Sequence, residues 1–363
     1  MEGEGGDAAA SMGSAPASRR GARALLLEDG SLALTADRRV MEWVGAWLPR
    51  HAPPAPPRHR AAALIHARAG APEGAVPEGA PTMELYGVRA WVSPADHHAV
   101  LADGHGRIGG RVEPGPLRAT IHVDPAAPPP DPRDVFATFT IAAAMLLTRL
   151  GRALVHAGAV VAPGGGAWLL PASSFSGKST TCATLIRGGW NYLGDDQVVL
   201  GDGSGGEVRA EGWPRLFHLD RGYAEGVSRG VRSRVDPGGL GPGRWQRSAP
   251  VAGLLFPRVE AELETTLLPL HPAAAFVLLL RQSPWILADG GGAAPVLALL
   301  EGIAALPCYE LRLGRDAYGD PARLQRAIEP ALAASATAPR GASKANHGPP
   351  PSRQAGQRTG VER

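Results

Sequence analysis

The segment from Pro171 to Thr180 has the residue types and spacing of a phosphate-binding loop. Gly177, Lys178 and Ser179 stand where that pattern requires a glycine, a lysine and a hydroxyl residue. Backbone N–H groups at the start of the following helix would face the phosphate oxygens, with the Lys178 ammonium near the β and γ phosphates and the Ser179 hydroxyl on Mg²⁺. We therefore expect the nucleotide phosphates to be held by Ser173, Ser174, Phe175, Ser176, Gly177, Lys178, Ser179 and Thr180.

One position of the loop departs from the pattern. Ala172 stands where the first glycine belongs, so the chain must turn differently there or absorb some strain. An ordinary serine- and glycine-rich turn between a strand and a helix is the alternative interpretation of the whole segment.

Two adjacent carboxylates, Asp195 and Asp196, begin 17 positions after Lys178. They end a run, residues 190–193, whose composition is typical of a strand. If that strand lies beside the loop strand, both carboxylates face the nucleotide, where one can bind Mg²⁺ and another can take a proton from a hydroxyl. We assign Asp195 as the base and Asp196, with Ser179, to the metal, although a coupled pair can share both tasks. Without the loop, such a pair is also typical of a solvated turn.

The elements that must position these residues follow from apolar periodicity and turn residues. Around the loop we expect a strand at 167–170, a helix at 178–187 and an apolar helix at 132–150. Further along, the pattern indicates antiparallel strands around 201–206 and at 253–256 and 265–270, helices near 272–282 and 294–305, a strand at 309–313 and a last helix from Pro321. Upstream it predicts a hairpin at 24–36, a helix at 39–48, a linker at 51–60 and strands at 85–92 and 119–123.

Composition divides the chain into a folded body and two irregular ends. Gly and Pro number 48 and 35, yet hydrophobic residues make up 44%. We expect a disordered N-terminus (1–22), an α+β region (23–130), an ATP-binding domain (131–335) and a disordered basic tail (336–363). The tail carries five Lys or Arg and one Glu, so the net charge of +3 leaves −1 for the rest, and a nucleic-acid partner is not expected.

No segment reads as a membrane span or an export signal. The most apolar helix candidate, Val135 to Leu150, has 16 residues and includes Arg149. The N-terminus lacks the apolar stretch of a signal peptide, and the two cysteines, Cys182 and Cys308, give neither a disulfide framework nor a metal site. These features predict a cytoplasmic protein without a membrane partner, with both cysteines as reduced core residues.

Residues 151–220 resemble the HPr serine kinase/phosphorylase family and its relatives. The matching runs are Arg152-Ala-Leu-Val-His156-Ala-Gly-Ala, Leu169-Leu-Pro-Ala-Ser-Ser-Phe-Ser-Gly177-Lys178-Ser179-Thr180 and Gly188-Gly-Trp-Asn-Tyr-Leu-Gly-Asp195-Asp196. The resemblance implies an α/β fold with a P-loop core of the HPr kinase/phosphoenolpyruvate carboxykinase type and a mixed sheet with much antiparallel strand. The residue patterns before position 131 add a small N-terminal α+β region, which does not resemble the usual N-terminal domain of that family. It also implies catalytic roles for His156, Lys178, Asp195 and Asp196. Taken alone, His156 in an apolar run is also typical of a satisfied core residue.

The chain departs from that family in Thr180, where glutamate is favoured, and in residues 221–250, which lack the later signature loop. The resemblance therefore implies an ATP- and Mg²⁺-dependent kinase with a different acceptor, a serine hydroxyl on a small protein or peptide, in a possible homo-oligomer. A non-catalytic ATP-binding switch and a small-molecule kinase or carboxykinase-like enzyme are the alternatives. The Arg- and Gly-rich segment 221–247 is either a solvated loop or a flap that supplies a cation to the phosphates.

Overall fold

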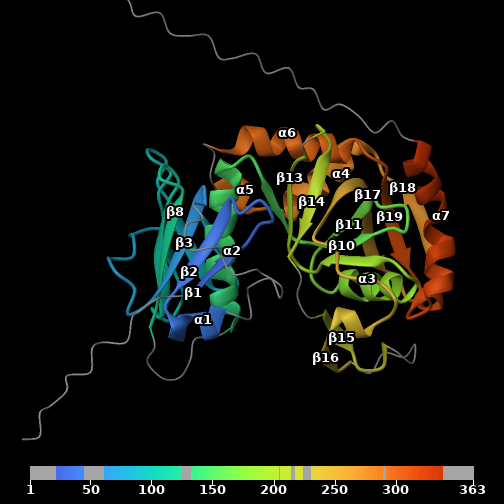
Figure 1. Ribbon diagram of the computed structural model, residues 1–363, viewed down its shortest axis with the longest axis horizontal. Helices are drawn as coiled ribbons and strands as arrows, with labels where there is room; N and C mark the ends of the chain where they lie inside the picture. Colours follow the sequence, from blue (N-terminus) through green and yellow to red (C-terminus); the bar gives the residue numbers. More distant parts are fainter. Residues whose placement is uncertain are drawn as a thin grey trace, which may run out of the picture.

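The computed structural model describes residues 22–44, 61–124, 132–203, 205–213, 217–223, 230–288 and 292–337. The expected disordered N-terminus, the linker and the basic tail lie outside this part, except for Ala22 and residues 336 and 337, which belong to a strand and to the last helix. The chain is an α/β protein with two large sheets of mixed parallel and antiparallel strands and a separate two-stranded sheet (Figure 1).

The first large sheet contains only strands from the N-terminal region. Its strand order is β1 (Ala22–Leu25), β2 (Leu32–Ala36), β3 (Ala63–Ala69), β8 (Arg118–Val123), β7 (Ile108–Glu113), β6 (Ala99–Ala102), β5 (Val88–Val92) and β4 (Met83–Leu85). The predicted hairpin at 24–36 is present as β1 and β2. The predicted strand at 85–92 is instead a hairpin. Tyr86 and Gly87 have φ values of 50° and 86°, which turn the chain back between β4 and β5.

Two helices pack on this sheet. α1 (Arg38–Val44) begins near the predicted residue, and the rest of the predicted 39–48 helix lies outside the described residues. α2 (Pro132–Arg149) matches the predicted 132–150 helix and is buried over most of its surface. It contacts strands of the first sheet on one side and β9 (Ala153–Val155) and α5 (Trp285–Ala288) on the other (Figure 1). Because both sides of α2 are buried, its own apolar residues are distributed all around the helix.

The turn of the first hairpin adds polar contacts between the two large sheets. The Glu28 N–H donates to the Glu211 carboxylate, and the Ser248 hydroxyl donates to the Glu28 carboxylate at 2.8 Å. Asp29 forms an ion pair with Arg152. The N-terminal sheet is thus joined to the rest of the protein by the apolar helix α2 and by this group of charged side chains.

The second large sheet carries the phosphate-loop segment. Its strand order is β12 (Asn191–Gly194), β10 (Ala157–Val161), β11 (Ala167–Pro171), β17 (Ser248–Val259), β14 (Val208–Gly212), β13 (Val198–Asp202) and β9. β19 (Cys308–Leu313) also pairs with β17, and β18 (Thr266–Pro269) pairs with β19. β11, β17 and β19 run parallel, so their carboxyl ends share one edge of the sheet.

Helices cover both faces of this second sheet (Figure 1). Alternate side chains of β11 enter two separate cores. Trp168 and Leu170 pack in the core that includes α3 (Lys178–Arg187) and α7 (Pro321–Thr337). Ala167 and Leu169 pack in the core that includes α4 (Pro272–Arg281), α5 and α6 (Ala293–Ala304). In the part of the chain that the structure describes, no helix is long and apolar enough to cross a membrane.

Candidate functional site: a phosphate-binding loop beside paired carboxylates

The predicted phosphate loop lies between a central strand and the start of a helix. β11 ends at Pro171, and α3 begins at Lys178, as the sequence predicted. No side chain caps the first turn of α3, because the residue before it is Gly177 with φ of 98°. The N–H groups of that turn are therefore oriented as donors for an anion.

The positive φ angles of the loop fall at Phe175, with 67°, and at Gly177. Ala172 is not among the residues with positive φ, so alanine at the first glycine position needs no left-handed backbone. The left-handed φ favours glycine at position 177, and a Cβ there would also lie 2.7 Å from the Leu313 Cδ1 atom, so the Leu313 side chain would have to move. The loop turns differently from the glycine pattern, as expected for alanine at that position.

The Lys178 ammonium lies inside the loop. Its Nζ atom donates to the Ala172 carbonyl at 2.7 Å and to the Ser173 carbonyl at 2.8 Å, and the residue is 5% exposed. Burial lowers the pKa of Lys178, while the neighbouring charges of Asp196 and Asp195 oppose that shift. Because the Lys178 ammonium already lies inside the loop, it can replace its hydrogen bonds to the loop carbonyls with hydrogen bonds to phosphate oxygens without a large movement.

Three neighbouring strands bring the predicted residues to one edge of the second sheet. β12 does not lie directly beside the loop strand β11, because β10 lies between them. Since β10 is antiparallel to both, the carboxyl end of β12 still meets the carboxyl end of β11. His156 directly precedes β10, whose first residue, Ala157, pairs with Pro171. The edge therefore collects His156, the loop and the two aspartates.

Asp195 faces the loop helix. The Ser179 hydroxyl donates to its two carboxylate oxygens at 2.9 and 3.1 Å, and Asp195 is 2% exposed. We expected Asp196 to share the metal with Ser179, but the hydrogen bonds join Ser179 to Asp195. A hydroxyl and a carboxylate in contact provide the hard oxygen donors that Mg²⁺ prefers, and phosphate oxygens would complete its shell. The residues present fit a Mg²⁺ ion at this point.

Asp196 faces the other way, toward His156. Its Oδ1 atom lies 3.7 Å from the His156 Nε2 atom, and its side chain is 48% exposed. The backbone of Asp196 is left-handed, with φ of 64°, which turns adjacent carboxylates to different sides. The two aspartates thus occupy different environments, one buried against the loop helix and one at the surface beside an imidazole.

Gly158 is a site residue that the motif reasoning did not single out. A Cβ on Gly158 would lie 2.7 Å from the Cys182 Sγ atom and 3.6 Å from the Asp195 Oδ1 atom. A side chain there would clash with Cys182 of α3, whereas its distance to Asp195 is an ordinary contact. A glycine within an apolar run of this kind is the sequence signal for such close approach. Cys182 and Cys308 are free and buried, as predicted for core thiols, and burial raises the pKa of Cys182 well above its usual value.

One arginine of the segment 221–247 reaches the loop. β15 (Phe217–Asp220) and β16 (Arg232–Val235) form a hairpin beside α3 (Figure 1). The guanidinium carbon of Arg232 lies 4.6 Å from the ring centroid of Phe175, which is 79% exposed at the tip of the loop. Within the described part of this segment, Arg232 therefore places a second cation above the phosphate loop.

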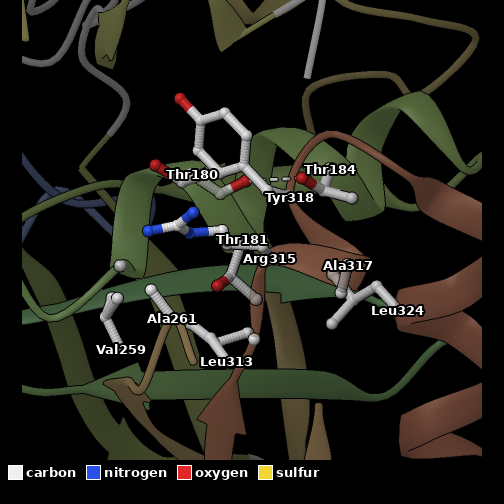
Figure 2. A pocket seen from close by; sticks show the side chains of 12 residues that line it. Thr180, Thr181, Thr184, Val259, Ala261, Leu313, Arg315, Ala317, Tyr318 and Leu324 are labelled. Atoms are coloured by element: carbon white, nitrogen blue, oxygen red, sulfur yellow. Dashed lines mark hydrogen bonds between the residues drawn. The ribbon is translucent and has the colours of Figure 1, made fainter. Parts of the chain in front are cut away.

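A pocket of about 630 Å³ adjoins the loop on the far side of α3 from the aspartates' strand. Figure 2 shows its walls. One helix face contributes Thr180, Thr181 and Thr184, and the other walls are formed by Val259, Ala261, Leu313, Arg315, Ala317, Tyr318 and Leu324. Val259 and Leu313 end β17 and β19, the strands parallel to the loop strand. The pocket and the loop thus lie at the same edge of the sheet.

No known family model matches this chain, and neither does any curated protein sequence.

Proposed function

We propose that the protein is an ATP- and Mg²⁺-dependent kinase that transfers the γ-phosphate to a hydroxyl group, a serine of a small protein or peptide. One observation carries the proposal: a strand–loop–helix segment of phosphate-loop pattern meets two adjacent carboxylates and a histidine at one sheet edge. An ordinary turn would not need a buried lysine inside it or a buried aspartate against its helix. The kind of acceptor follows from the family resemblance alone.

The environments of the two aspartates suggest a division of roles. Asp195, in contact with Ser179, is the carboxylate for Mg²⁺, which would neutralise charge on the phosphates when bound. Asp196, exposed and beside His156, is the carboxylate that can meet an acceptor from solvent. This exchanges the roles expected from the sequence.

In the proposed step, Asp196 accepts the proton of the acceptor hydroxyl while that oxygen bonds to the γ-phosphorus and the bond to the β–γ bridging oxygen breaks. The products are a phosphoester and ADP, and the proton remains on Asp196 or passes to His156. Lys178 and the N–H groups of the loop hold the phosphates in line. Arg232, above Phe175, adds positive charge where the transferring group sits.

The test uses two amide variants of equal size. Asp196→Asn should keep Mg·ATP binding and lower phosphoryl transfer by ~10²–10⁴-fold, because an amide is no base. Asp195→Asn should weaken the Mg²⁺ dependence of ATP binding, because an amide oxygen is a poorer ligand for a hard cation. Calorimetry gives the binding, and mass spectrometry follows the gain of one phosphate on peptides or small carrier proteins encoded nearby.

Two outcomes would change the proposal. Exchanged phenotypes would restore Asp195 as the base and leave the kinase in place. A wild-type protein that binds Mg·ATP yet transfers to no protein, peptide or small-molecule acceptor, with both variants binding as it does, would show a nucleotide-dependent switch.

A further inference from the structure

Helices α4 and α6 have apolar residues on all sides, although one side of the pair faces solvent. Each helix contains a single charged residue, Arg281 in α4 and Glu301 in α6. Only two residues of α4 are fully buried, and Val277, on the opposite side of that helix, is 48% exposed. A helix that is apolar all round is normally buried all round, so this surface indicates a further layer that covers it.

The exposed apolar surface continues from α4 onto the strand before it. Leu268 of β18 is 38% exposed, and it lies on the same face of the second sheet as α4, because the adjacent Leu267 packs against the core that includes α3. Beside Val277, Ala274 is exposed and Leu280 is half-buried. Contiguous exposed apolar residues with charged residues at their margin are typical of a protein interaction site.

The two charged residues lie at opposite ends of this surface. The Leu270 N–H, just before α4, donates to the Cys308 carbonyl, shortly after α6, so α4 begins where α6 ends. Because the two helices pack together, they run antiparallel, with Glu301 near the first turn of α4 and Arg281 at its last residue. The length of α4 separates these positions by about 14 Å. Both residues are exposed, and neither has an ion-pair partner among the residues that the structure describes.

An apolar surface with an unpaired cation at one end and an unpaired anion at the other is complementary to its own copy. In a two-fold dimer each contact occurs twice, so an axis through the middle of α4 brings Arg281 of each copy to Glu301 of the other. A uniformly acidic or basic partner would satisfy only one of these two charges. The geometry therefore favours a second copy of this chain over a partner with a single sign of charge.

We propose that the outer face of α4 and α6 is the interface of a two-fold homodimer, with Val277 packed near the axis and two Arg281–Glu301 ion pairs at the margins. The inference does not depend on the proposed function. The phosphate-loop helix α3 packs on the opposite face of the second sheet, so the dimer leaves both phosphate loops accessible.

Sedimentation equilibrium of the full chain measures the dissociation constant of the dimer over a ~100-fold range of protein concentration. Val277→Glu places a charge at the centre of the interface. Val76→Glu, between β3 and β4 at a residue that is 50% exposed, is the matched control. The charge test uses Arg281→Glu, Glu301→Arg and the double variant that carries both substitutions. Far-UV circular dichroism checks that each variant is folded.

We expect the wild type to form dimers. Val277→Glu should raise the dissociation constant by ~10²-fold or more, because a buried charge without a partner is costly, and the control should change it by less than ~2-fold. Each single charge variant should raise it by ~10-fold, because like charges then meet at both margins. The double variant restores opposite charges across the interface and should lie within ~3-fold of the wild type. Arg281 and Glu301 are too far apart for this restoration to arise inside one copy.

Three results would overturn the proposal. A wild type that stays monomeric over the whole concentration range would show that this surface does not bind its own copy. If the wild type dimerises and Val277→Glu weakens the dimer no more than the control does, the interface lies elsewhere on the molecule. If both single charge variants weaken the dimer and the double variant is no stronger than they are, the two-fold pairing of Arg281 with Glu301 is wrong.

Discussion

The charged group at the first hairpin turn makes the stability of the protein depend on pH through Glu211. Its carboxylate accepts the Glu28 N–H and lies 3.4 Å from the Arg247 Nε atom. Burial is the largest influence and raises the pKa of Glu211 from 4.5 to about 7, against the opposing effects of the Glu28 N–H, Arg247 and Arg152. In this balance the desolvation of the carboxylate outweighs its ion pair.

The direction of the effect follows from proton binding. Between pH 4.5 and about 7 the folded protein holds this proton more tightly than the unfolded chain does, so stability is greatest below that range and falls as pH rises through it. Since one pKa unit corresponds to about 1.4 kcal/mol, the loss between pH 5 and pH 8 amounts to roughly 2–3 kcal/mol. Glu211→Gln keeps the acceptor for the Glu28 N–H and removes the titration.

Urea unfolding of the wild type and Glu211→Gln at pH 5 and pH 8 measures this. The variant should gain stability relative to the wild type by roughly 2–3 kcal/mol on going from pH 5 to pH 8. Glu207→Gln, the same change near the end of the same hairpin of β13 and β14, is the control and should show no comparable gain. An equal difference between wild type and Glu211→Gln at both pH values would refute the reasoning.

Two predictions concern the phosphate loop. Lys178→Met removes the buried ammonium and should weaken Mg·ATP binding or transfer by ~10²-fold or more. Its melting temperature should not fall by many degrees. If calorimetry shows wild-type ATP affinity in this variant and turnover is intact, the loop assignment is contradicted. Arg232→Ala should lower transfer by ~10²-fold and change ATP affinity less, because in the proposed mechanism the Arg232 cation acts on the transferring group; Arg232→Lys should have an intermediate effect. Arg234→Ala on the same strand is the matched control, and an equal loss in both alanine variants would assign the effect to the hairpin as a whole.

The local elements of the site could be predicted from the sequence because their signals are local. The strand before the loop, the helix from Lys178 to Arg187 and the turn between them occur where the pattern placed them. The order of strands could not be predicted in the same way. Residues 154–161 read as one apolar run, yet the chain leaves β9 and enters β10 at His156, whose N–H donates to the Gln282 carbonyl at 2.8 Å. The point at which the chain passes from β9 to β10 is determined by long-range strand pairing, which the local residue pattern does not contain.

The roles within the aspartate pair depend on backbone direction rather than on residue type. The sequence predicts that both carboxylates face the nucleotide, and it does not indicate which of them contacts the loop helix. The left-handed backbone at Asp196 and the pairing of Ala159 with Gly194 place Asp195 under α3. Gly158 lets α3 lie close to β10, because it leaves room for the Cys182 side chain.

The pocket is the part of the site that sequence motifs could least predict, since its walls come from α3, the ends of β17 and β19, and the start of α7. Its position nevertheless follows from the sheet. β17 and β19 run parallel to β11, so the carboxyl ends of all three open on one edge, where α/β proteins bind ligands. The antiparallel strand β10 brings His156 and, through β12, the aspartates to the loop from the other side. A single sheet edge therefore places the carboxylates on one side of the phosphate loop and the apolar pocket on the other.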